Sequence, residues 1–311
     1  MATPVREFEQ VCWNEQLAED SRWLIRRALA EDLGEGDLTS LALIPAAASG
    51  KAACVARQPG IVAGLPVVPL ALREVDHGLR LTTNIGDAEP VAPGECVAWV
   101  EGPVASVLAA ERLMLNLLGR LSGIASLTRR YVEAVAGTGA RIYDTRKTTP
   151  GWRLLEKYAV RCGGGNNHRS GLYEAILIKD NHLAFGAGPL GRFSPAEAVR
   201  RAREFAERHA TASQGEPAIL EIEVDTLDQL IEVLPARPDI VLLDNMPPDV
   251  LREAVARRNA LAPEVELEAS GGVTIATVRS IAESGVERIS IGGLTHSAVA
   301  LDFGLDWPDS P

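Results

Sequence analysis

The chain has 311 residues, 46% of them hydrophobic, so it can bury a large core and is not expected to be disordered. Its 42 acidic residues against 31 basic ones give a net charge of −11. This charge argues against a general surface for nucleic acids or anionic membranes, because such surfaces neutralise phosphate groups with lysine and arginine.

The sequence shows no targeting, membrane or disulfide pattern. The N-terminal stretch MATPVREFEQ has no apolar run of the kind that a signal peptide needs, and the most apolar stretch, GIVAGLPVVPLAL, is short and contains two prolines. We therefore expect a soluble, cytoplasmic protein. Cys12, Cys54, Cys96 and Cys162 form no C-x-x-C pair or zinc-type cluster, so we expect neither disulfides nor structural zinc. Cys162 has no identifiable general base and is interpreted as a space-filling residue.

The N-terminal part of the chain predicts a small α+β domain. Residues 22–45 have the composition of a helix followed by a glycine- and aspartate-rich turn, EDLGEGDLTS, in which Asp37 or Thr39 could cap the next element. Between Lys51 and Val104, the β-like runs KAACVAR, LRLTTNIG and CVAWVEG are separated by glycine, proline and aspartate, which is typical of a sheet with turns.

A long helix is predicted to link this domain to the rest of the chain. In SVLAAERLMLNLLGRLSGIASLTRRYVEAV, apolar residues recur at helical spacing. Gly119 and the pair Ser122-Gly123 are predicted to be weak points of this helix, because glycine is a poor helix former.

After Gly139, six short strands alternate with amphipathic helices, which is the pattern of a parallel α/β structure. The helix in SPAEAVRRAREFAERHA is expected to begin with Ser194 as its cap and Pro195 in its first turn. Each strand starts apolar and ends polar, and in a barrel of parallel strands these ends meet at one mouth, where the active site is built. The strands are predicted in ARIYDTRK, EAILIKDNH, AILEIEVDT, DIVLLDNM, VELEASGG and ERISIGGL.

Positive charge is concentrated between Arg141 and His182. This segment holds eight basic and four acidic residues, a net charge of +4 in a chain whose net charge is −11. Because the rest of the chain is acidic, we expect the partner of this segment to be a small anion rather than a polymer.

The strand AILEIEVD carries two carboxylates on one face. Glu221 and Glu223 alternate with three apolar residues, so both point away from the apolar side of the strand. If that apolar side meets the helices, the glutamates point into the barrel. Burying them without a partner is costly, so we expect a lysine or arginine of the basic segment, or a magnesium ion, beside them.

Together, the polar strand ends predict a metal-assisted transfer reaction on an anionic, phosphorylated substrate. The glycine-bearing ends of the last two strands can bind phosphate with main-chain N–H groups. Glu223 and Asp244 suit Mg²⁺, and lysine and arginine suit carboxylates and further phosphates. The cations are Arg146, Lys147, His168, Arg169 and Lys179, and the glycine-bearing ends are Ser270-Gly271-Gly272 and Gly292-Gly293.

Each feature taken alone also has a simpler interpretation. A Gly-Gly pair after a strand is most often a turn, and a glutamate facing a lysine is as often a structural pair as a catalytic one. His296 fits a loop hydrogen-bonder, and Arg153, Lys157 and Arg161 lie in a helix-like run that could face solvent. These separate interpretations do not explain why polar groups occur at all six strand ends.

These residues closely resemble one family. The motif DTRKTTPGWRLLEKYAVRCGGGNNHRSGLYEAILIKDNH, followed by EIEVD, LLDNM, LEASGG and ISIGGLTHSA, is similar to quinolinate phosphoribosyltransferase, also called nicotinate-nucleotide pyrophosphorylase (carboxylating). The likeness covers nearly the whole chain. It implies an N-terminal α+β open sandwich with its linking helix (residues 1–120), an incomplete parallel α/β barrel of about six to seven strands (121–298), and a C-terminal tail (299–311) that returns to the N-terminal domain.

The resemblance also implies an activity. Quinolinate and 5-phosphoribosyl-1-pyrophosphate would give nicotinate mononucleotide, pyrophosphate and CO2, a step of de novo NAD biosynthesis, with Mg²⁺ as cofactor. The chain would form a homodimer, or a hexamer built from dimers, with no nucleic-acid or membrane partner.

Residue roles follow from the same motifs. Lys147, Glu223 and Asp244 would be catalytic, and Glu223 and Asp244 would also hold Mg²⁺ directly, through water or through substrate. Quinolinate would be bound by Arg112 of the neighbouring subunit together with Thr145, Arg146, Lys147, His168, Arg169 and Lys179. Phosphoribosyl pyrophosphate would be bound by Lys147, Lys179, Glu223, Asp244, Ser270, Gly271, Gly272, Gly292, Gly293 and His296.

Three other functions are open to test. A Schiff-base lyase would use Lys147 or Lys179 as its amine. A phosphoribosyltransferase with another base specificity is expected to lack part of the set Arg112, Arg146 and Arg169, which is complete here. An RNA-binding role is disfavoured, because aromatic residues, which stack on single-stranded bases, make up only 5% of the chain.

Overall fold

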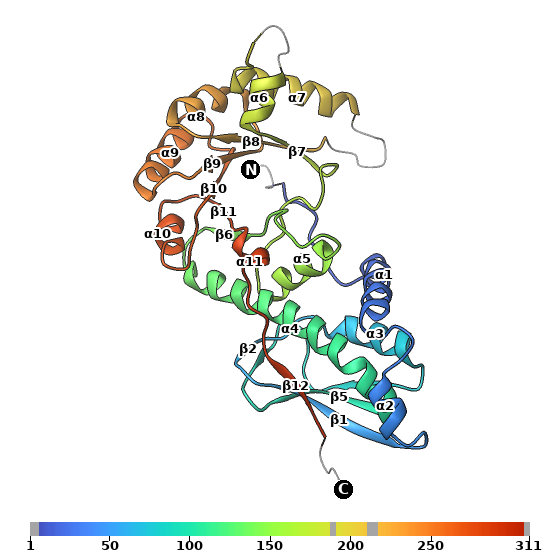
Figure 1. Ribbon diagram of the computed structural model, residues 1–311. Coiled ribbons are helices and arrows are strands. Elements are labelled where there is room, and N and C mark those ends of the chain that lie inside the picture. Colours follow the sequence, from blue (N-terminus) through green and yellow to red (C-terminus); the bar gives the residue numbers. More distant parts are fainter. Residues whose placement is uncertain (1–5, 187–190, 210–216, 308–311) are drawn as a thin grey trace. The chain divides into compact units, whose positions relative to one another are not determined.

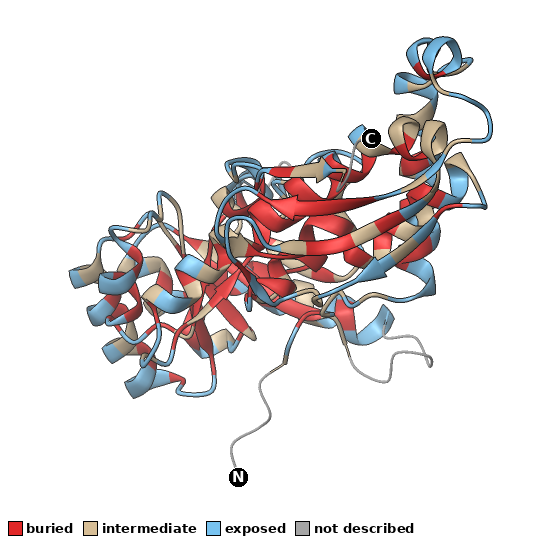
Figure 2. Ribbon diagram, turned by 90° about the horizontal axis from the view of Figure 1, so that it is seen from below, coloured by how far each residue is buried: buried red, intermediate tan, exposed pale blue. Residues whose placement is uncertain are grey.

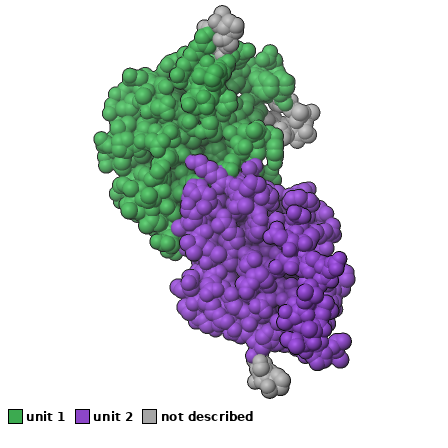
Figure 3. Space-filling view, viewed as in Figure 1, with its two compact units in different colours: residues 1–10, 130–146, 166–292 green, residues 11–129, 147–165, 293–311 purple. Residues whose placement is uncertain are grey.

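The computed structural model describes residues 6–186, 191–209 and 217–307 (Figure 1). The chain forms two compact units, shown in different colours in Figure 3. The barrel unit contains residues 1–10, 130–146 and 166–292, and the sandwich unit contains residues 11–129, 147–165 and 293–311. Both units are thus assembled from separate stretches of sequence, and the three predicted domain ranges stay a prediction.

The barrel unit is built on a six-stranded parallel sheet with the order β6-β11-β10-β9-β8-β7. The sheet ends at β6 on one side and β7 on the other, so the barrel is incomplete, as predicted. All six strands fall in the predicted stretches. They are β6 (Arg141–Tyr143), β7 (Ala175–Ile178), β8 (Ile219–Val224), β9 (Ile240–Asp244), β10 (Glu266–Ser270) and β11 (Arg288–Ser290).

Helices follow most of these strands in the sequence, and Figure 1 shows α7 to α10 outside the arc of strands. In Figure 2 the strands are mostly buried, and the outer faces of the helices are exposed. Ser194 caps α7 as predicted, with its Oγ accepting a hydrogen bond from the Glu197 N–H at 3.3 Å. The helices are α6 (Asp180–Gly186), α7 (Pro195–His209), α8 (Leu227–Val233), the short 3₁₀ turn η3 (Leu234–Ala236), α9 (Pro248–Leu261) and α10 (Val278–Ala282).

Residues 6–10 belong to the barrel unit and close the amino-terminal end of its sheet. Phe8 packs in a small core with the first residues of three strands, Ala175, Ile219 and Ile240. Glu7 forms ion pairs with Arg141 and Arg288, which begin β6 and β11. This segment was given no structural role from the sequence.

The sandwich unit contains an antiparallel sheet with the order β12-β1-β5-β3. The predicted β-like runs correspond to three of its strands, and the fourth, β12, comes from the C-terminal part of the chain and pairs with β1. The strands of this unit are β1 (Ser49–Ala56), β2 (Gly60–Ile61), β3 (Arg80–Thr83), β4 (Pro90–Val91), β5 (Cys96–Pro103) and β12 (Phe303–Asp306), with β2 and β4 pairing separately.

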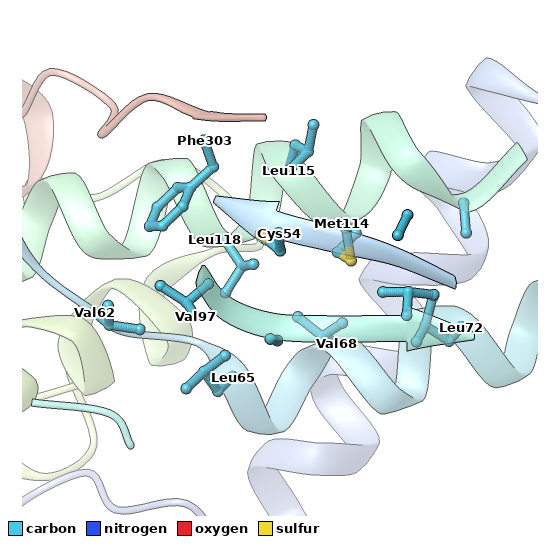
Figure 4. Packing of buried hydrophobic residues seen from close by; sticks show 14 of the residues in the cluster. Cys54, Val62, Leu65, Val68, Leu72, Val97, Met114, Leu115, Leu118 and Phe303 are labelled. Carbon is cyan, nitrogen blue, oxygen red and sulfur yellow. The ribbon is translucent and has the colours of Figure 1, made fainter. Parts of the chain in front are cut away.

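Helices pack against this sheet around a buried apolar core (Figure 4). Val68 and Leu72 enter the core from α3, and Met114 and Leu118 enter it from α4. The first helix begins earlier than predicted, at Glu15 with Asn14 as its cap. The helices are α1 (Glu15–Asp32), α2 (Leu38–Leu43), the 3₁₀ turn η1 (Leu65–Val67), α3 (Val68–Val75), α4 (Val104–Ala134), α5 (Arg153–Cys162) and α11 (Gly293–His296).

The predicted cap of the second helix is confirmed. The Asp37 carboxylate accepts hydrogen bonds from the Thr39 and Ser40 N–H groups at 3.0 and 3.2 Å and begins α2. Among the described helices, none is both long and apolar enough to cross a membrane.

The prediction of weak points within the linking helix is wrong, because α4 is continuous over 31 residues. The glycines serve close packing instead. A Cβ added to Gly123 would lie 2.1 Å from the Val299 carbonyl oxygen, and one added to Gly119 would lie 2.8 Å from that of Leu301. Ser122 is buried, and its Oγ accepts a hydrogen bond from the Ala63 N–H at 3.0 Å.

Candidate functional site

The carboxyl ends of the six parallel strands bring together most of the predicted site residues. Thr145 and Arg146 follow β6, Lys179 follows β7, and Gly292 follows β11. The other ends are supplied by residues within or just after β8, β9 and β10, namely Glu223, Asp244, Ser270, Gly271 and Gly272. Because the strands are parallel, all of these residues lie at the same end of the sheet.

Lys179 and Glu223 form an ion pair across neighbouring strands. The Lys179 side chain is 43% exposed and that of Glu223 is 14% exposed, so the pair lies at the boundary between the barrel interior and solvent. Of the two expected partners, the structure thus places a lysine of the basic segment beside Glu223, and beside Glu221 it places His168, which is neither a lysine nor an arginine.

Asp244 is held by a tight turn that sequence reasoning missed. Asn245 has a positive φ of 54°, its N–H donates to the Ser270 carbonyl at 2.8 Å, and its Nδ2 donates to Asp244 Oδ2 at 2.7 Å. Gly271 has a φ of 93°, and a Cβ there would lie 2.2 Å from Asn245 Oδ1. Asparagine tolerates the left-handed region better than most residues, so its place directly after a strand was the available signal.

The loop that carries His168 and Arg169 is tied to the end of β6 by Asp144. Asp144 is buried, and its Oδ1 accepts a hydrogen bond from the His168 N–H at 2.9 Å. Its Oδ2 accepts another from Asn167 Nδ2 at 2.6 Å. Asp144 therefore fixes the loop to the end of β6.

His168 is buried and both of its ring nitrogens face other groups of the protein. Nδ1 accepts a hydrogen bond from the Arg169 N–H at 2.8 Å. Nε2 lies 3.0 Å from Glu221 Oε2 and 3.7 Å from Glu268 Oε1. The ligand atoms of these three residues lie within 4.8 Å of one another, so the group has the size of a metal site as well as of a proton-sharing cluster.

Glu268 is the member of this group that sequence reasoning missed. Burial, and then the neighbouring Glu221, raise the pKa of Glu268 to about 7, while His168, Ser290 and Arg288 act in the opposite direction. The sequence pattern predicts the strand but gives no separate signal for this glutamate, which lies within an apolar-to-polar run.

Arg169 is buried next to a second cation. Its Nη1 donates to the Ala175 carbonyl at 2.8 Å. Burial, and then the positive charge of Arg146, lower its pKa, and Glu221 and Glu174 offset this in part. Two guanidinium groups placed this close are stabilised by an anion between or beside them.

The remaining predicted residues belong to the sandwich unit. Arg112 is exposed on α4. Lys147 is exposed, and its carbonyl accepts a hydrogen bond from Thr295 Oγ1 at 2.8 Å. Gly293 begins α11 and the exposed His296 ends it, with His296 Nδ1 lying 2.7 Å from Ser297 Oγ. Their predicted roles stay predictions.

Helix α5 contains two residues, Lys157 and Cys162, for which the sequence suggested a simple structural role. Lys157 is fully buried, so a solvent-facing role for it is wrong. Cys162 is a buried free thiol, and burial raises its pKa to about 12, which fits a space-filling residue rather than a nucleophile.

The sequence matches models of both domains of one family. Residues 37–122 match the N-terminal domain of quinolinate phosphoribosyl transferase, and residues 124–306 match its C-terminal domain. A nicotinate-nucleotide pyrophosphorylase (carboxylating) of Mycobacterium leprae is 44% identical over 289 residues, which cover 92% of this chain and 96% of that protein. A probable enzyme of the same name from Bacillus subtilis is 40% identical over 283 residues, covering 91% and 92% of the two chains.

Comparison of the fold with solved structures indicates the same family. The structure of the nicotinate-nucleotide pyrophosphorylase from Francisella tularensis superposes with a TM-score of 0.86 at 33% identity, covering 97% of this chain and all of that one. With family models that match both halves, and relatives that match over nearly their whole length, the chain belongs to the quinolinate phosphoribosyl transferase family.

Proposed function

We propose that this enzyme transfers the phosphoribosyl group of 5-phosphoribosyl-1-pyrophosphate to quinolinate, with loss of CO2, to give nicotinate mononucleotide and pyrophosphate. The observation that carries the proposal is the buried guanidinium of Arg169, whose pKa is lowered by the positive charge of Arg146, a residue that follows β6 at the end of the sheet where active sites are built. A site that keeps two such cations together is adapted to a ligand with more than one negative charge.

Quinolinate supplies that charge as two adjacent carboxylates on a pyridine ring. The proposed pocket uses Arg169, Arg146 and Thr145 at the β6 side of the sheet and Lys179 at the β7 side, with His168 within the same wall. Lys147 directly follows Arg146 in the chain and is proposed to serve both substrates. The number of cations favours a dicarboxylate over nicotinate, which has a single carboxylate.

The phosphoribosyl group is proposed to lie over the ends of β8 to β11. Glu223 and Asp244 are at neighbouring strand ends and suit the ribose hydroxyls. The 5-phosphate is assigned to main-chain N–H groups after the last two strands, at Ser270, Gly271, Gly272, Gly292, Gly293 and His296. Lys147 and Lys179 would face the pyrophosphate.

The donor set fits a magnesium ion. Glu223 and Asp244 offer carboxylate oxygens that are partly exposed, which is the kind of set that holds Mg²⁺ together with water and substrate phosphates. Bound there, the ion would offset negative charge on the departing pyrophosphate. Glu223 is paired with Lys179 in the structure, so this lysine and the ion would share its carboxylate.

The reaction needs charge stabilisation more than a dedicated base. The pyridine nitrogen forms a bond to C1 of the ribose as the C1–oxygen bond to pyrophosphate breaks, so positive charge develops on the ribose close to Glu223 and Asp244. The alkylated ring is then cationic, so its positive nitrogen stabilises the electron pair that stays on C2 when the 2-carboxylate leaves as CO2, and C2 then takes a proton from water to give nicotinate mononucleotide. We assign no residue to the decarboxylation.

We also propose that the enzyme works as a homodimer in which the partner subunit's Arg112 completes each quinolinate pocket. Arg112 is exposed on α4, which leaves its side chain available to another subunit. An isologous dimer would give both pockets the same arrangement.

The activity is tested by incubating the purified protein with quinolinate labelled at the 2-carboxylate, phosphoribosyl pyrophosphate and MgCl₂. We expect nicotinate mononucleotide, pyrophosphate and labelled CO2 in equal amounts. A product formed from nicotinate but not from quinolinate would show a different base specificity. A substrate adduct trapped on Lys147 or Lys179 by borohydride would replace the proposal with Schiff-base chemistry.

A further inference from the structure

The His168 ring has no nitrogen directed away from the protein. A nitrogen that accepts a hydrogen bond carries no proton, so the N–H of Arg169 leaves Nδ1 unprotonated. The other nitrogen faces the buried carboxylates of Glu221 and Glu268. A direct hydrogen bond from this ring to a substrate carboxylate would require it to give up one of these partners.

The face of the ring is also occupied. Phe8 stacks on His168 with ring centroids 4.3 Å apart and an angle of 28° between the planes. Phe8 is itself buried, and Arg288 lies 5.6 Å from the centroid of its ring. The ring of His168 is therefore supported by the N-terminal segment on one face and by carboxylates at one edge.

The same N-terminal segment holds the loop on the other side of His168. Gln10 Oε1 accepts a hydrogen bond from the Asn167 N–H at 2.9 Å, and Gln10 Nε2 donates to the Asn167 carbonyl at 3.1 Å. The Glu9 N–H donates to Glu174 Oε1 at 2.8 Å, and Glu174 also accepts from the Ser170 N–H. Residues 8–10 thus contact the loop before, at and after the pair His168-Arg169.

We propose that His168 is a positioning residue, and that Phe8 and Gln10 hold it so that its Nδ1 fixes the Arg169 main chain and thereby the guanidinium that binds the substrate carboxylate. The inference rests on the proposed function for the identity of that ligand. It assigns to the N-terminal segment, far in sequence from the strand ends, a direct effect on quinolinate affinity.

The first test compares two replacements of His168 by isothermal titration with quinolinate. In His168→Asn, the amide oxygen can take the place of Nδ1 as acceptor for Arg169, whereas His168→Leu has no acceptor. We expect the quinolinate Kd to rise about tenfold, or ~1.4 kcal/mol, in His168→Leu and less than about threefold in His168→Asn. Equal losses in the two variants would mean that the imidazole binds the substrate itself and would overturn the proposal.

The second test is a double-mutant cycle with Phe8→Leu, which removes the stacked ring and keeps most of the apolar volume. We expect this change to raise the quinolinate Kd in the wild-type background, to leave the KM for phosphoribosyl pyrophosphate unchanged, and to add nothing in the His168→Leu background. Glu9→Ala, whose side chain is exposed in the same segment, is the matched control and should change neither value. The same Kd increase in both backgrounds would show a general structural effect and contradict the proposal.

A third measurement needs no substrate. The chain has five histidines, so the His168 ring signals can be assigned in an NMR spectrum by the loss of one set in His168→Asn. Phe8→Leu and, if that variant folds poorly, Gln10→Ala should shift the His168 ring and the Arg169 amide, whereas Glu9→Ala should not. A wild-type protein that bound no quinolinate would contradict the proposed function. The NMR comparison would still show whether Phe8 and Gln10 position His168. Unchanged signals in both variants would refute the coupling.

Discussion

The charged form of Arg169 is disfavoured in the folded protein. Burial, and then the positive charge of Arg146, lower the pKa of its guanidinium, and Glu221 and Glu174 offset this only in part. Its main-chain partner, the Ala175 carbonyl, orients the guanidinium but does not neutralise it. Such an arrangement is retained where a ligand brings the missing negative charge.

Replacing Arg169 by glutamine should therefore act mainly on binding. We expect the quinolinate Kd to rise about 10- to 150-fold, since a charge-assisted hydrogen bond contributes ~1.5 to 3 kcal/mol. Arg252→Gln, an exposed position on α9, makes the same change in net charge and should leave the Kd unaltered. A similar effect in both variants, measured by calorimetry, would assign the affinity to overall charge and not to Arg169.

Glu268 gives a pH-dependent prediction. Its pKa is raised from the ordinary 4.5 to about 7, chiefly by burial, so the folded protein holds a proton that the unfolded chain has lost between these pH values. The contribution of Glu268 to the free energy of unfolding is therefore most favourable below about pH 4.5, where the carboxyl is protonated in both states. This contribution is lost as the pH rises through about 7. Glu268→Gln should raise Tm at pH 8 relative to the wild type, and this gain should shrink toward pH 4.5. A Tm difference that is the same at both pH values would contradict the raised pKa.

The positions of Lys179 and Gly271 at strand ends were predictable, because each belongs to a charged or glycine-rich motif that directly follows a strand. Phe8, Asn245 and Glu268 were missed for physical reasons. Phe8 acts across more than 150 residues of sequence, Asn245 acts through a left-handed backbone, and Glu268 acts because it is buried beside Glu221. None of these properties produces a local pattern in the sequence.

At the scale of elements, the alternation of glutamate and apolar residues in β8 was the most informative signal for the site. It placed Glu221 and Glu223 on one face, and the structure gives each a partner, the His168 imidazole for the first and the Lys179 ammonium for the second. The pattern could not assign which carboxylate meets which partner, because that depends on the register between β7 and β8. It also could not show that Glu221 is fully buried while Glu223 reaches the mouth.

In the linking helix α4, helix propensity alone gave the wrong prediction of weak points at the glycines. Gly119 and Gly123 weaken an isolated helix, but here they allow the chain at Val299 to Leu301 to lie directly against α4. That stretch is more than 170 positions away in the sequence, so no local rule could reveal it.

Gly123→Ala tests this explanation. Alanine is the better helix former by about 1 kcal/mol, so propensity alone predicts a more stable protein. Because the new Cβ would lie 2.1 Å from the Val299 carbonyl, we expect instead a net loss of about 1 to 3 kcal/mol in the free energy of unfolding. Gly139→Ala, where nothing lies within 4 Å of the new Cβ, is the control and should have little effect. A raised Tm for Gly123→Ala would show that the helix and the C-terminal chain are not in close contact in solution.

At the scale of the whole molecule, the alternating pattern after Gly139 was sufficient to predict a parallel α/β structure, because each strand and helix has its own local signal, whereas the incomplete barrel was implied by the family resemblance. The contribution of residues 6–10 to the barrel unit was not predictable. It depends on Glu7 meeting Arg141 and Arg288 at the starts of two distant strands, and a short segment without periodicity gives no indication of its partners.

The proposed dimer predicts complementation between inactive subunits. Arg112→Ala and Lys147→Ala homodimers should each be nearly inactive. After subunit exchange, about half of the dimers are mixed, and each has one complete site of two, so activity should recover to about a quarter of the wild-type value. The readout is the initial rate of nicotinate mononucleotide formation, with labelled subunits to show that exchange occurred. Proven exchange without recovery would place Arg112 outside any shared site.

The central claim is that the cations at the mouth of the barrel select a ligand with two adjacent carboxylates, and its most direct test is isothermal titration of the wild-type protein with quinolinate and with nicotinate, without phosphoribosyl pyrophosphate so that no turnover occurs. One further charge-assisted hydrogen bond contributes ~1.5 to 3 kcal/mol, so we expect quinolinate to bind about tenfold more tightly or better. Equal dissociation constants for the two acids would contradict the account.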